Sequence, residues 1–182
     1  MPVFDAMTSG YYIPSYAEVY SSYIEDSETG DMVPRLDWTS YVIPINTHSK
    51  IQFEEYPLSS QYDGSYAFKW MNHYGIKTPP GYSTLFVTPF HHSDLPFFCL
   101  PGIVDTDKYH LPVNFPFFLK KGFTGVIPLG TPMIQAIPFK RDDWESVVNE
   151  HIPLEQNKRL LTFKQSVIHS YKNKYRSKKA FK

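Results

Sequence analysis

The chain has 182 residues, with 18 basic and 18 acidic side chains and a mean hydropathy of −0.36. These values indicate a soluble globular protein with one sizeable core. Its single cysteine, Cys99, excludes an intramolecular disulfide, and we expect this residue to be a buried small hydrophobe.

The N-terminal residues, MPVFDAMTSGYY, contain neither a positively charged region nor a long apolar stretch. No window of the chain approaches the run of about 18 apolar residues that a membrane span needs. We therefore expect neither a signal peptide nor a membrane partner.

Aromatic residues make up 17% of the chain and 16 prolines outnumber 9 glycines, which favours short strands joined by rigid turns. In chain order, the alternation in SYAEVYSSYI first predicts a half-buried strand over 15–24, followed by an acidic, turn-rich loop over 25–34. A second strand is predicted in SKIQFEEY (49–56), and a tight turn at Asp63-Gly64.

The middle of the chain consists of short apolar runs separated by turn residues. KTPPGYSTLFVTPF (77–90) predicts a turn that leads into a strand ending at Pro89. The runs that follow are FFCLPG, GIVDT, VNFPFFL, FTGVIP and PMIQAIPF. Turn signals recur about every ten residues, which is typical of an all-β sandwich or barrel. Pro116, inside VNFPFFL, predicts an edge strand or a bulge.

After Pro153 the pattern changes to that of a helix, because there is no further Gly or Pro and apolar residues recur every three or four positions. The apolar positions are Leu160, Phe163, Val167, Tyr171 and Tyr175. We therefore expect a mainly β core domain over residues 1–150, of jelly-roll or β-clip type, and a basic amphipathic helix over 151–182.

Charge is divided unevenly between the two ends of the chain. Residues 1–60 carry nine acids and two bases, whereas residues 151–182 carry nine bases and one acid. This asymmetry would let the tail of one copy dock on the acidic face of another, or direct the tail to a polyanion.

The order PPGY, PGIVDTDKY and GTPMIQAIP is similar to the central part of the dUTPase and dCTP deaminase superfamily, over about sixty residues. The resemblance implies a β-clip fold. It also implies a water-activating acid at Asp105, with Asp107 beside it, and nucleotide contacts by Tyr109 and Gln135. Where that family has its phosphate-binding Pro-Arg-Ser-Gly element, this chain has PFHHSD (89–94), so His91 and His92 are the candidate nucleotide contacts there.

Several parts of that family's pattern are missing. The strand that carries Gln135 has Pro132 or Met133 in place of the family's arginine, and the Gly-rich tail is replaced by the basic segment. A triphosphate needs several fixed donors and a metal held by carboxylates. The match therefore argues for shared architecture more than for shared chemistry.

A longer resemblance covers nearly the whole chain. VFDAMTSGYYIP, IKTPPGYSTLFVTP, GIVDTDKYHLPVNFPFFL, GVIPLGTPMIQAIPFKRDDW and SYKNKYRSKK are similar to an uncharacterised protein family of large tailed myophages. This resemblance implies a viral source, with the protein in the host cytoplasm or the virion. It implies no activity.

Three sets of residues are candidates for a site, each with an alternative. Asp105 and Asp107 would share one face of an extended strand and hold a divalent metal, or they cap backbone N–H groups in a polar turn. His92 and Asp94, with the later His151, imitate the ligands of an iron/2-oxoglutarate oxygenase, or they belong to a solvated loop.

The basic residues of the tail are the third set. Interleaved with tyrosines, they suit nucleic acid, or they lie in solvent while the aromatic face of the helix packs on a core or a second subunit. The residues concerned are Lys172, Lys174, Arg176, Lys178 and Lys179.

The leading expectation is a phage-encoded structural or accessory protein that self-associates through a β-rich core and does no chemistry. Its partner would be a second copy or another assembly component. The alternatives are a diverged dUTPase-like nucleotide-binding or pyrophosphatase protein, and a metal-dependent oxygenase.

Overall fold

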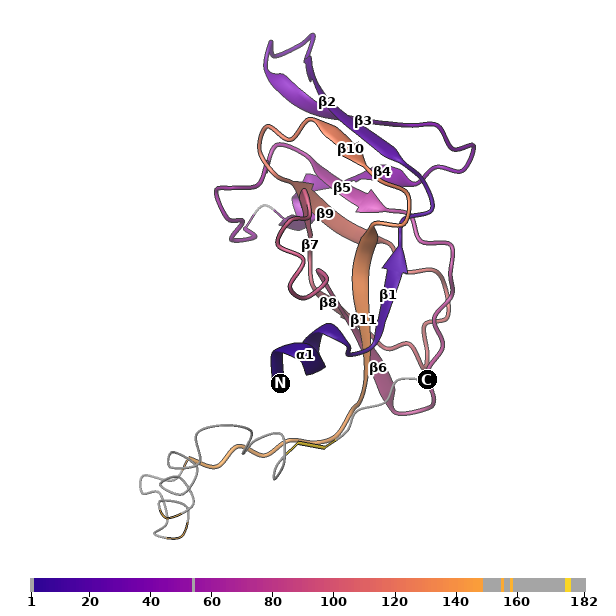
Figure 1. Ribbon diagram of the computed structural model, residues 1–182, viewed down its shortest axis with the longest axis vertical. Coiled ribbons are helices and arrows are strands. Elements are labelled where there is room, and N and C mark those ends of the chain that lie inside the picture. The colour runs from indigo at the N-terminus through magenta and orange to yellow at the C-terminus, as the bar shows by residue number, and fades with distance from the viewer. Residues whose placement is uncertain (1, 54, 149–154, 156–157, 159–175, 178–182) are drawn as a thin grey trace. The chain divides into compact units, whose positions relative to one another are not determined.

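The computed structural model describes residues 2–53, 55–148, 155, 158 and 176–177 (Figure 1). The chain divides into two compact units. The core domain is Gly10–Lys140, and the terminal unit consists of Met1–Ser9 and Arg141–Lys182. The described part of the terminal unit includes one α-helix, α1 (Pro2–Met7).

The core domain contains three antiparallel sheets, so the predicted mainly β class is confirmed. The first sheet has four strands in the order β1 (Tyr11–Pro14), β11 (Pro132–Lys140), β6 (Tyr82–Val87) and β8 (Gly102–Val104). The second has three, β10 (Gly125–Ile127), β2 (Val19–Glu25) and β3 (Met32–Trp38). The third has four, β4 (Ile45–His48), β5 (Ala67–Trp70), β9 (Phe115–Leu119) and β7 (Phe97–Cys99).

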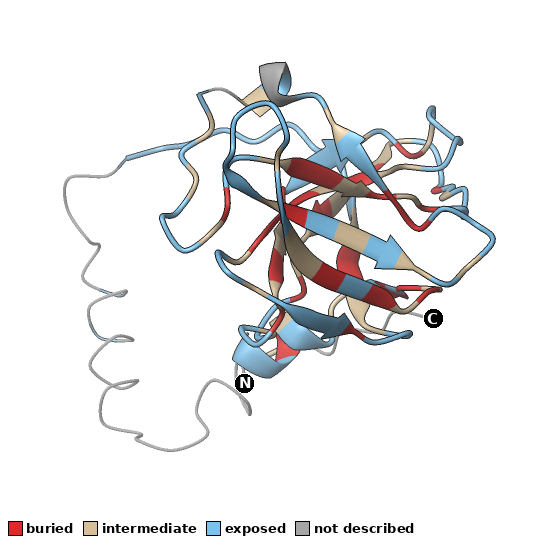
Figure 2. Cartoon of the chain, turned by 90° about the horizontal axis from the view of Figure 1, so that it is seen from above, coloured by how far each residue is buried: buried red, intermediate tan, exposed pale blue. Residues whose placement is uncertain are grey.

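All three sheets contribute to one hydrophobic core, in which the buried residues gather on the strands (Figure 2). Trp70 and Phe117 stack with ring centroids 4.9 Å apart, and Phe97 contacts Trp70 edge-on at 5.3 Å. Aromatic side chains of this size bury about 150–250 Å² each, so a few of them suffice to join short strands into one domain. The high aromatic content of the sequence therefore lies largely in the core.

The strand predicted over 15–24 corresponds to β2, and the predicted acidic loop turns into β3. In this turn the Asp26 carboxylate accepts hydrogen bonds from the N–H groups of Glu28 and Thr29 at 2.8 and 3.2 Å. The loop is shorter than expected, because β2 continues to Glu25 and β3 begins at Met32.

The strand predicted over 49–56 is wrong. That segment begins with a 3₁₀ helix, Lys50–Phe53, and the strand precedes it as β4. All four residues of β5 already pair with β4, from Ile45 opposite Trp70 to His48 opposite Ala67. Among the described residues, no strand is paired with the segment beyond His48. Its alternating sequence is therefore not sufficient to keep the segment extended.

The edge position or bulge predicted from Pro116 is also wrong. Strand β9 lies inside the third sheet, between β5 and β7, and pairs with both without a shift in register. The Pro116 carbonyl accepts a hydrogen bond from the Leu100 N–H at 2.8 Å. Leu100 lies just beyond the end of β7. The pairing between β7 and β9 has therefore ended at the position where Pro116 would have needed an N–H group.

The predicted C-terminal helix falls almost entirely on residues outside those described. Within the described ranges, no helix is long and apolar enough to cross a membrane.

Candidate functional site

Asp105 and Asp107, the two acids of the DTD segment (105–107), connect their own turn to the PPGY turn (79–82). One carboxylate oxygen of Asp105 accepts a hydrogen bond from the Ser83 hydroxyl at 2.6 Å. A carboxylate oxygen of Asp107 accepts one from the Gly81 N–H at 2.9 Å. The Asp105 carbonyl accepts hydrogen bonds from the N–H groups of Lys108 and Tyr109, which closes the turn. This geometry is that of the polar turn.

Between the two acids, Thr106 is completely buried. Its hydroxyl lies 2.7 Å from the Thr78 hydroxyl and 2.9 Å from the Thr84 hydroxyl. The Thr78 N–H also donates to the Thr106 carbonyl at 3.3 Å. Three hydroxyls that satisfy one another inside the protein fix the turn after β8 to the start of β6.

The threonine cluster and Ser83 are site residues that the sequence analysis missed. They stand inside or next to the PPGY and DTD stretches, but the resemblance assigns a role only to the acids and to Tyr109. The only signal in the sequence is that Thr106 separates two acids, because a residue between two exposed neighbours on an extended segment points inward.

The other group of candidate residues meets at the far end of β6. Gln135 is completely buried, and its side-chain oxygen accepts a hydrogen bond from the Phe90 N–H at 3.0 Å. This bond positions the loop of residues 88–95, which includes His91, His92 and Asp94. Lys120 supports the same loop, because its ammonium donates to the Ser93 carbonyl at 2.9 Å.

The structure therefore splits the candidate nucleotide-binding residues into two groups. Asp105 bonds to Ser83 near the start of β6, whereas Gln135 pairs with Val87 at its end. Ser83 and Val87 are four positions apart on β6, which corresponds to a length of about 13 Å along the strand. Tyr109 lies with the acids and is partly exposed, at 45%. His91 and His92 lie with Gln135.

His110 lies beside the two acids, whereas His73 bonds to a residue elsewhere. A ring nitrogen of His110 lies 3.0 Å from the Asp107 carbonyl oxygen. A ring nitrogen of His73 instead lies 2.6 Å from the Tyr16 hydroxyl.

The 88–95 loop has a strained backbone. His91 has φ of +64°, and it is the only non-glycine residue with positive φ within the described ranges. A residue in this left-handed region costs about 1–2 kcal/mol unless it is glycine. Strain of this kind concentrates at binding and catalytic sites, so it draws attention to this loop.

Two pockets flank this loop, and His92 lines both of them. One has a volume of about 410 Å³ and lies between the loop, the Tyr62 ring and the residues of β7. Its walls are mainly apolar, with Phe90, Phe98 and Pro101 among them. The other has a volume of about 440 Å³ and includes Asp94 and Lys120.

Within the described ranges, no group of three or more His, Cys, Asp or Glu side chains is placed to hold a metal ion. His151, the third residue of the proposed oxygenase set, lies outside those ranges. His92 instead packs edge-on against the Tyr12 ring, with centroids 5.8 Å apart.

Cys99 is completely buried, as predicted for a small hydrophobe. Its thiol donates to the Met133 carbonyl at 3.1 Å, and burial raises the pKa of the thiol far above its ordinary value. A protonated thiol is a poor nucleophile, so the position of Cys99 suits packing rather than catalysis.

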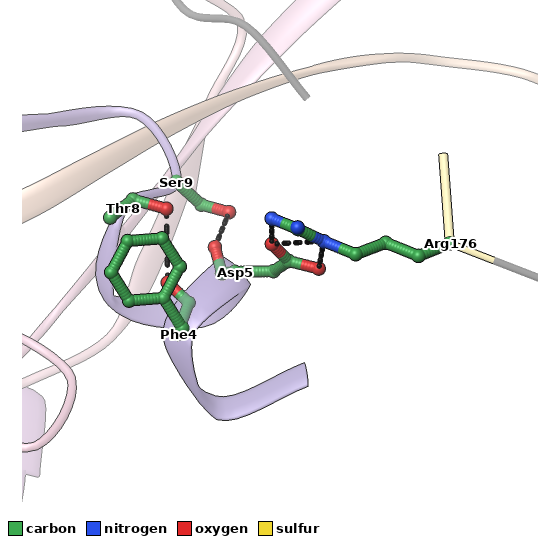
Figure 3. A network of polar contacts seen from close by, with 5 residues as sticks. All are labelled: Phe4, Asp5, Thr8, Ser9 and Arg176. Atoms are coloured by element: carbon green, nitrogen blue, oxygen red, sulfur yellow. Dashed lines mark hydrogen bonds and ion pairs between the residues drawn. The ribbon is translucent and has the colours of Figure 1, made fainter. Parts of the chain in front are cut away.

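Of the basic tail residues predicted to contact a partner, only Arg176 is described. Its guanidinium makes a bidentate ion pair with Asp5 of α1, with a closest N–O distance of 2.6 Å (Figure 3). Asp5 is buried. Lys172, Lys174, Lys178 and Lys179 lie outside the described residues.

No protein-family model matches the chain, and a search of curated proteins found no match.

Proposed function

We propose that this chain is a phage-encoded structural or accessory protein that self-associates. We further propose that its three sheets form a jelly-roll or β-clip arrangement. The viral source rests on the near full-length resemblance in sequence. Self-association rests on a separate observation, the exposure of large apolar side chains.

The observation that carries the proposal is that aromatic side chains remain in solvent although the core is densely packed. Tyr41 is fully exposed, Trp144 is 91% exposed and Tyr74 is 63% exposed. Single exposed apolar residues are common on monomeric proteins, but clusters of them indicate contact surfaces. Tyr41 belongs to such a cluster, since Val42 and Ile43 beside it are also exposed.

Hydrogen bonds hold this cluster in place. The Tyr16 hydroxyl donates to the Ile43 carbonyl at 2.7 Å. The Met71 N–H donates to the Pro44 carbonyl at 2.8 Å, which joins the Tyr41 loop to the loop that carries Tyr74. The buried Asn72 side chain bonds to both the N–H and the carbonyl of Tyr74. A backbone that is already ordered loses less entropy on association, so this arrangement favours a contact surface.

The carboxylates of the DTD turn support the same proposal. Asp105 and Asp107 bind a hydroxyl and a backbone N–H of the neighbouring turn. These are the interactions of residues that hold a fold together.

Sedimentation velocity over a range of concentrations tests self-association directly. We expect the weight-average mass to rise with concentration above 21.2 kDa, the mass of one chain. A mass that stays at that of one chain up to the solubility limit would overturn the proposal.

A diverged nucleotide-binding or pyrophosphatase protein is the second candidate. The bond between Asp107 and the Gly81 N–H favours it, because it brings together the two segments that resemble the superfamily. In a thermal-shift screen, nucleoside triphosphates with Mg²⁺ should raise the melting temperature, and Asp105→Asn should reduce the rise. No shift at millimolar ligand would overturn this candidate.

A further inference from the structure

Residues 141–148, RDDWESVV, follow β11 and have no strand or helix structure. We call them the arm. Its three apolar side chains are the most exposed large apolar side chains among the terminal unit's described residues: Trp144 at 91%, Val148 at 89% and Val147 at 71%. An extended segment that presents a tryptophan and two valines to water has the character of a ligand rather than of a folded element.

The arm is also acidic. Asp142, Asp143 and Glu145 surround Trp144, against one base, Arg141. A partner surface should therefore combine an apolar cavity for the indole with positive charge or N–H donors around it.

The smaller pocket beside the 88–95 loop has both properties. Its volume of about 410 Å³ lies in the range of protein pockets that bind side-chain-sized apolar groups. Buried Leu95, Phe97 and Cys99 line it. Tyr62 and Phe98 form one wall, with ring centroids 5.4 Å apart. We call it the Tyr62 pocket.

One basic side chain lies beside the Tyr62 pocket. The Lys120 ammonium bonds to the carbonyl of Ser93, a lining residue. Lys120 also pairs with Tyr62 in an isolated β-bridge, and the Lys121 N–H donates to the Gln61 carbonyl at 2.9 Å. The Lys120 ammonium therefore adjoins the pocket. His91 and His92 line it and add ring nitrogens.

We propose that the arm of one copy binds in the Tyr62 pocket of a second copy, with Trp144 as the anchor and the flanking acids facing Lys120. This inference rests on the proposed self-association and names the contact that mediates it. Among the exposed apolar segments, the arm is the one for which the core domain offers a cavity of complementary charge. The three residues of the Tyr41 cluster carry no charge, so charge complementarity points to no cavity for them.

Two full-length variants remove the two halves of the contact. Trp144→Ala removes the anchor and leaves the pocket intact. Ser93→Trp places a large side chain at the pocket and leaves the arm intact, and because Ser93 is exposed the core is not disturbed. In sedimentation experiments, each variant alone should associate at least about tenfold more weakly than the wild type, as expected for loss of a central tryptophan.

Mixing the two variants gives the decisive result. An intact arm on Ser93→Trp can enter the intact pocket of Trp144→Ala, so an equimolar mixture should form one-to-one dimers. A mixture that stays monomeric would overturn the inference. A melting temperature equal to that of the wild type would show that neither variant has lost its fold.

A matched control uses the other fully exposed aromatic residue. Tyr41→Ala removes a side chain of similar size from a different surface, and it should weaken association less than Trp144→Ala does. If Tyr41→Ala weakens association and Trp144→Ala does not, the arm contact is wrong and the proposed function stands. If the wild type is monomeric, both fail.

Electrostatics supplies an independent test. The double variant Asp143→Lys, Glu145→Lys should weaken association of otherwise wild-type protein, and added salt should weaken the wild type in the same direction. Association that is unchanged by both would contradict the proposed orientation of the arm.

Discussion

Thr106 shows how much one buried hydroxyl can organise. It is the shared partner of Thr78 and Thr84, and all three are buried. Replacing Thr106 with Val keeps the shape but removes the hydrogen-bond partner of the Thr84 hydroxyl, whereas the Thr78 hydroxyl still bonds to the Tyr82 carbonyl at 3.3 Å. An unsatisfied buried polar group costs about 1–3 kcal/mol. We expect Thr106→Val to lower the free energy of unfolding by about that amount in urea titrations.

The control is Thr47→Val, at an exposed position in β4, which should change stability by less than about 0.5 kcal/mol. If Thr106→Val were as stable as the wild type, the threonine cluster would not contribute to the fold.

Cys99 gives a stability that depends on pH. Burial raises the pKa of its thiol above the ordinary value of 9.0. Above that value the unfolded chain loses the proton and the folded chain keeps it, so stability falls as the pH rises. The slope from this one group is at most about 1.4 kcal/mol per pH unit. Cys99→Ala should flatten the decline in unfolding free energy above pH 9, and an equal slope in both proteins would contradict the assignment.

At the scale of single residues, the sequence predicted some roles and missed others for a physical reason. Cys99 could be predicted because a lone cysteine between apolar neighbours has few alternatives. The partners of Asp105 could not, since Ser83 lies 22 positions away and reaches it only through the pairing of β6 with β8.

Among the elements, the junction before β1 depends on a glycine. Gly10 has φ of +69°, and a Cβ there would lie 2.0 Å from the Ala136 carbonyl oxygen in β11. We expect Gly10→Ala to push β1 away from β11 and to lower the free energy of unfolding by at least about 2 kcal/mol, from left-handed strain and overpacking together. Chemical denaturation measures this value.

Gly30 is the matched control for this prediction. It has φ of +74°, but a Cβ added there would meet no other atom within 4 Å, so Gly30→Ala bears only the backbone strain of about 1–2 kcal/mol. An equal decrease in the free energy of unfolding for both variants would show that the contact with Ala136 does not destabilise Gly10→Ala.

The elements that the sequence predicted well are those whose local pattern and pairing agree. Strand β2 alternates in the sequence and finds partners on both sides. The segment 49–56 alternates too, but β5 is too short to pair with it. Pro116 predicted an edge strand, but it lies in an interior one. Its missing N–H is tolerated because the neighbouring strand β7 ends beside it, and local sequence does not show where a neighbouring strand ends.

At the scale of the whole molecule, an ion pair joins α1 to Arg176 within the terminal unit. The side chains of Asp5 and Arg176 are only 7% and 23% exposed, so breaking the pair should cost about 3 kcal/mol. Asp5→Asn should therefore speed amide hydrogen exchange in α1 by about tenfold or more, relative to the amides of β9.

The exposed pair Arg35–Asp37 provides the comparison, with both side chains more than half exposed. Asp37→Asn should leave exchange in α1 and in β9 unchanged. Protection of α1 that survives Asp5→Asn would show that other contacts hold the helix.

The sequence predicted the class of fold but not the layout of the candidate site. Composition and turn spacing are sufficient for a mainly β chain, because they reflect local preferences. The division of the candidate residues between the two ends of β6 depends on registers such as Gln135 opposite Val87, which are set by long-range pairing. The resemblance to the superfamily predicted that Asp105 and Gln135 lie in one site. Their spacing in the sequence could not show that they lie at opposite ends of β6.

The arm and the Tyr62 pocket are different surfaces of the same chain, and this difference determines what kind of assembly they can build. When two copies are joined by a single arm–pocket contact, one arm and one pocket remain unused. Growth by this contact is therefore directional, with every copy facing the same way, and it stops only when a ring closes or when another component covers an end. A closed ring would have a fixed number of copies, whereas an open row would have two chemically distinct ends.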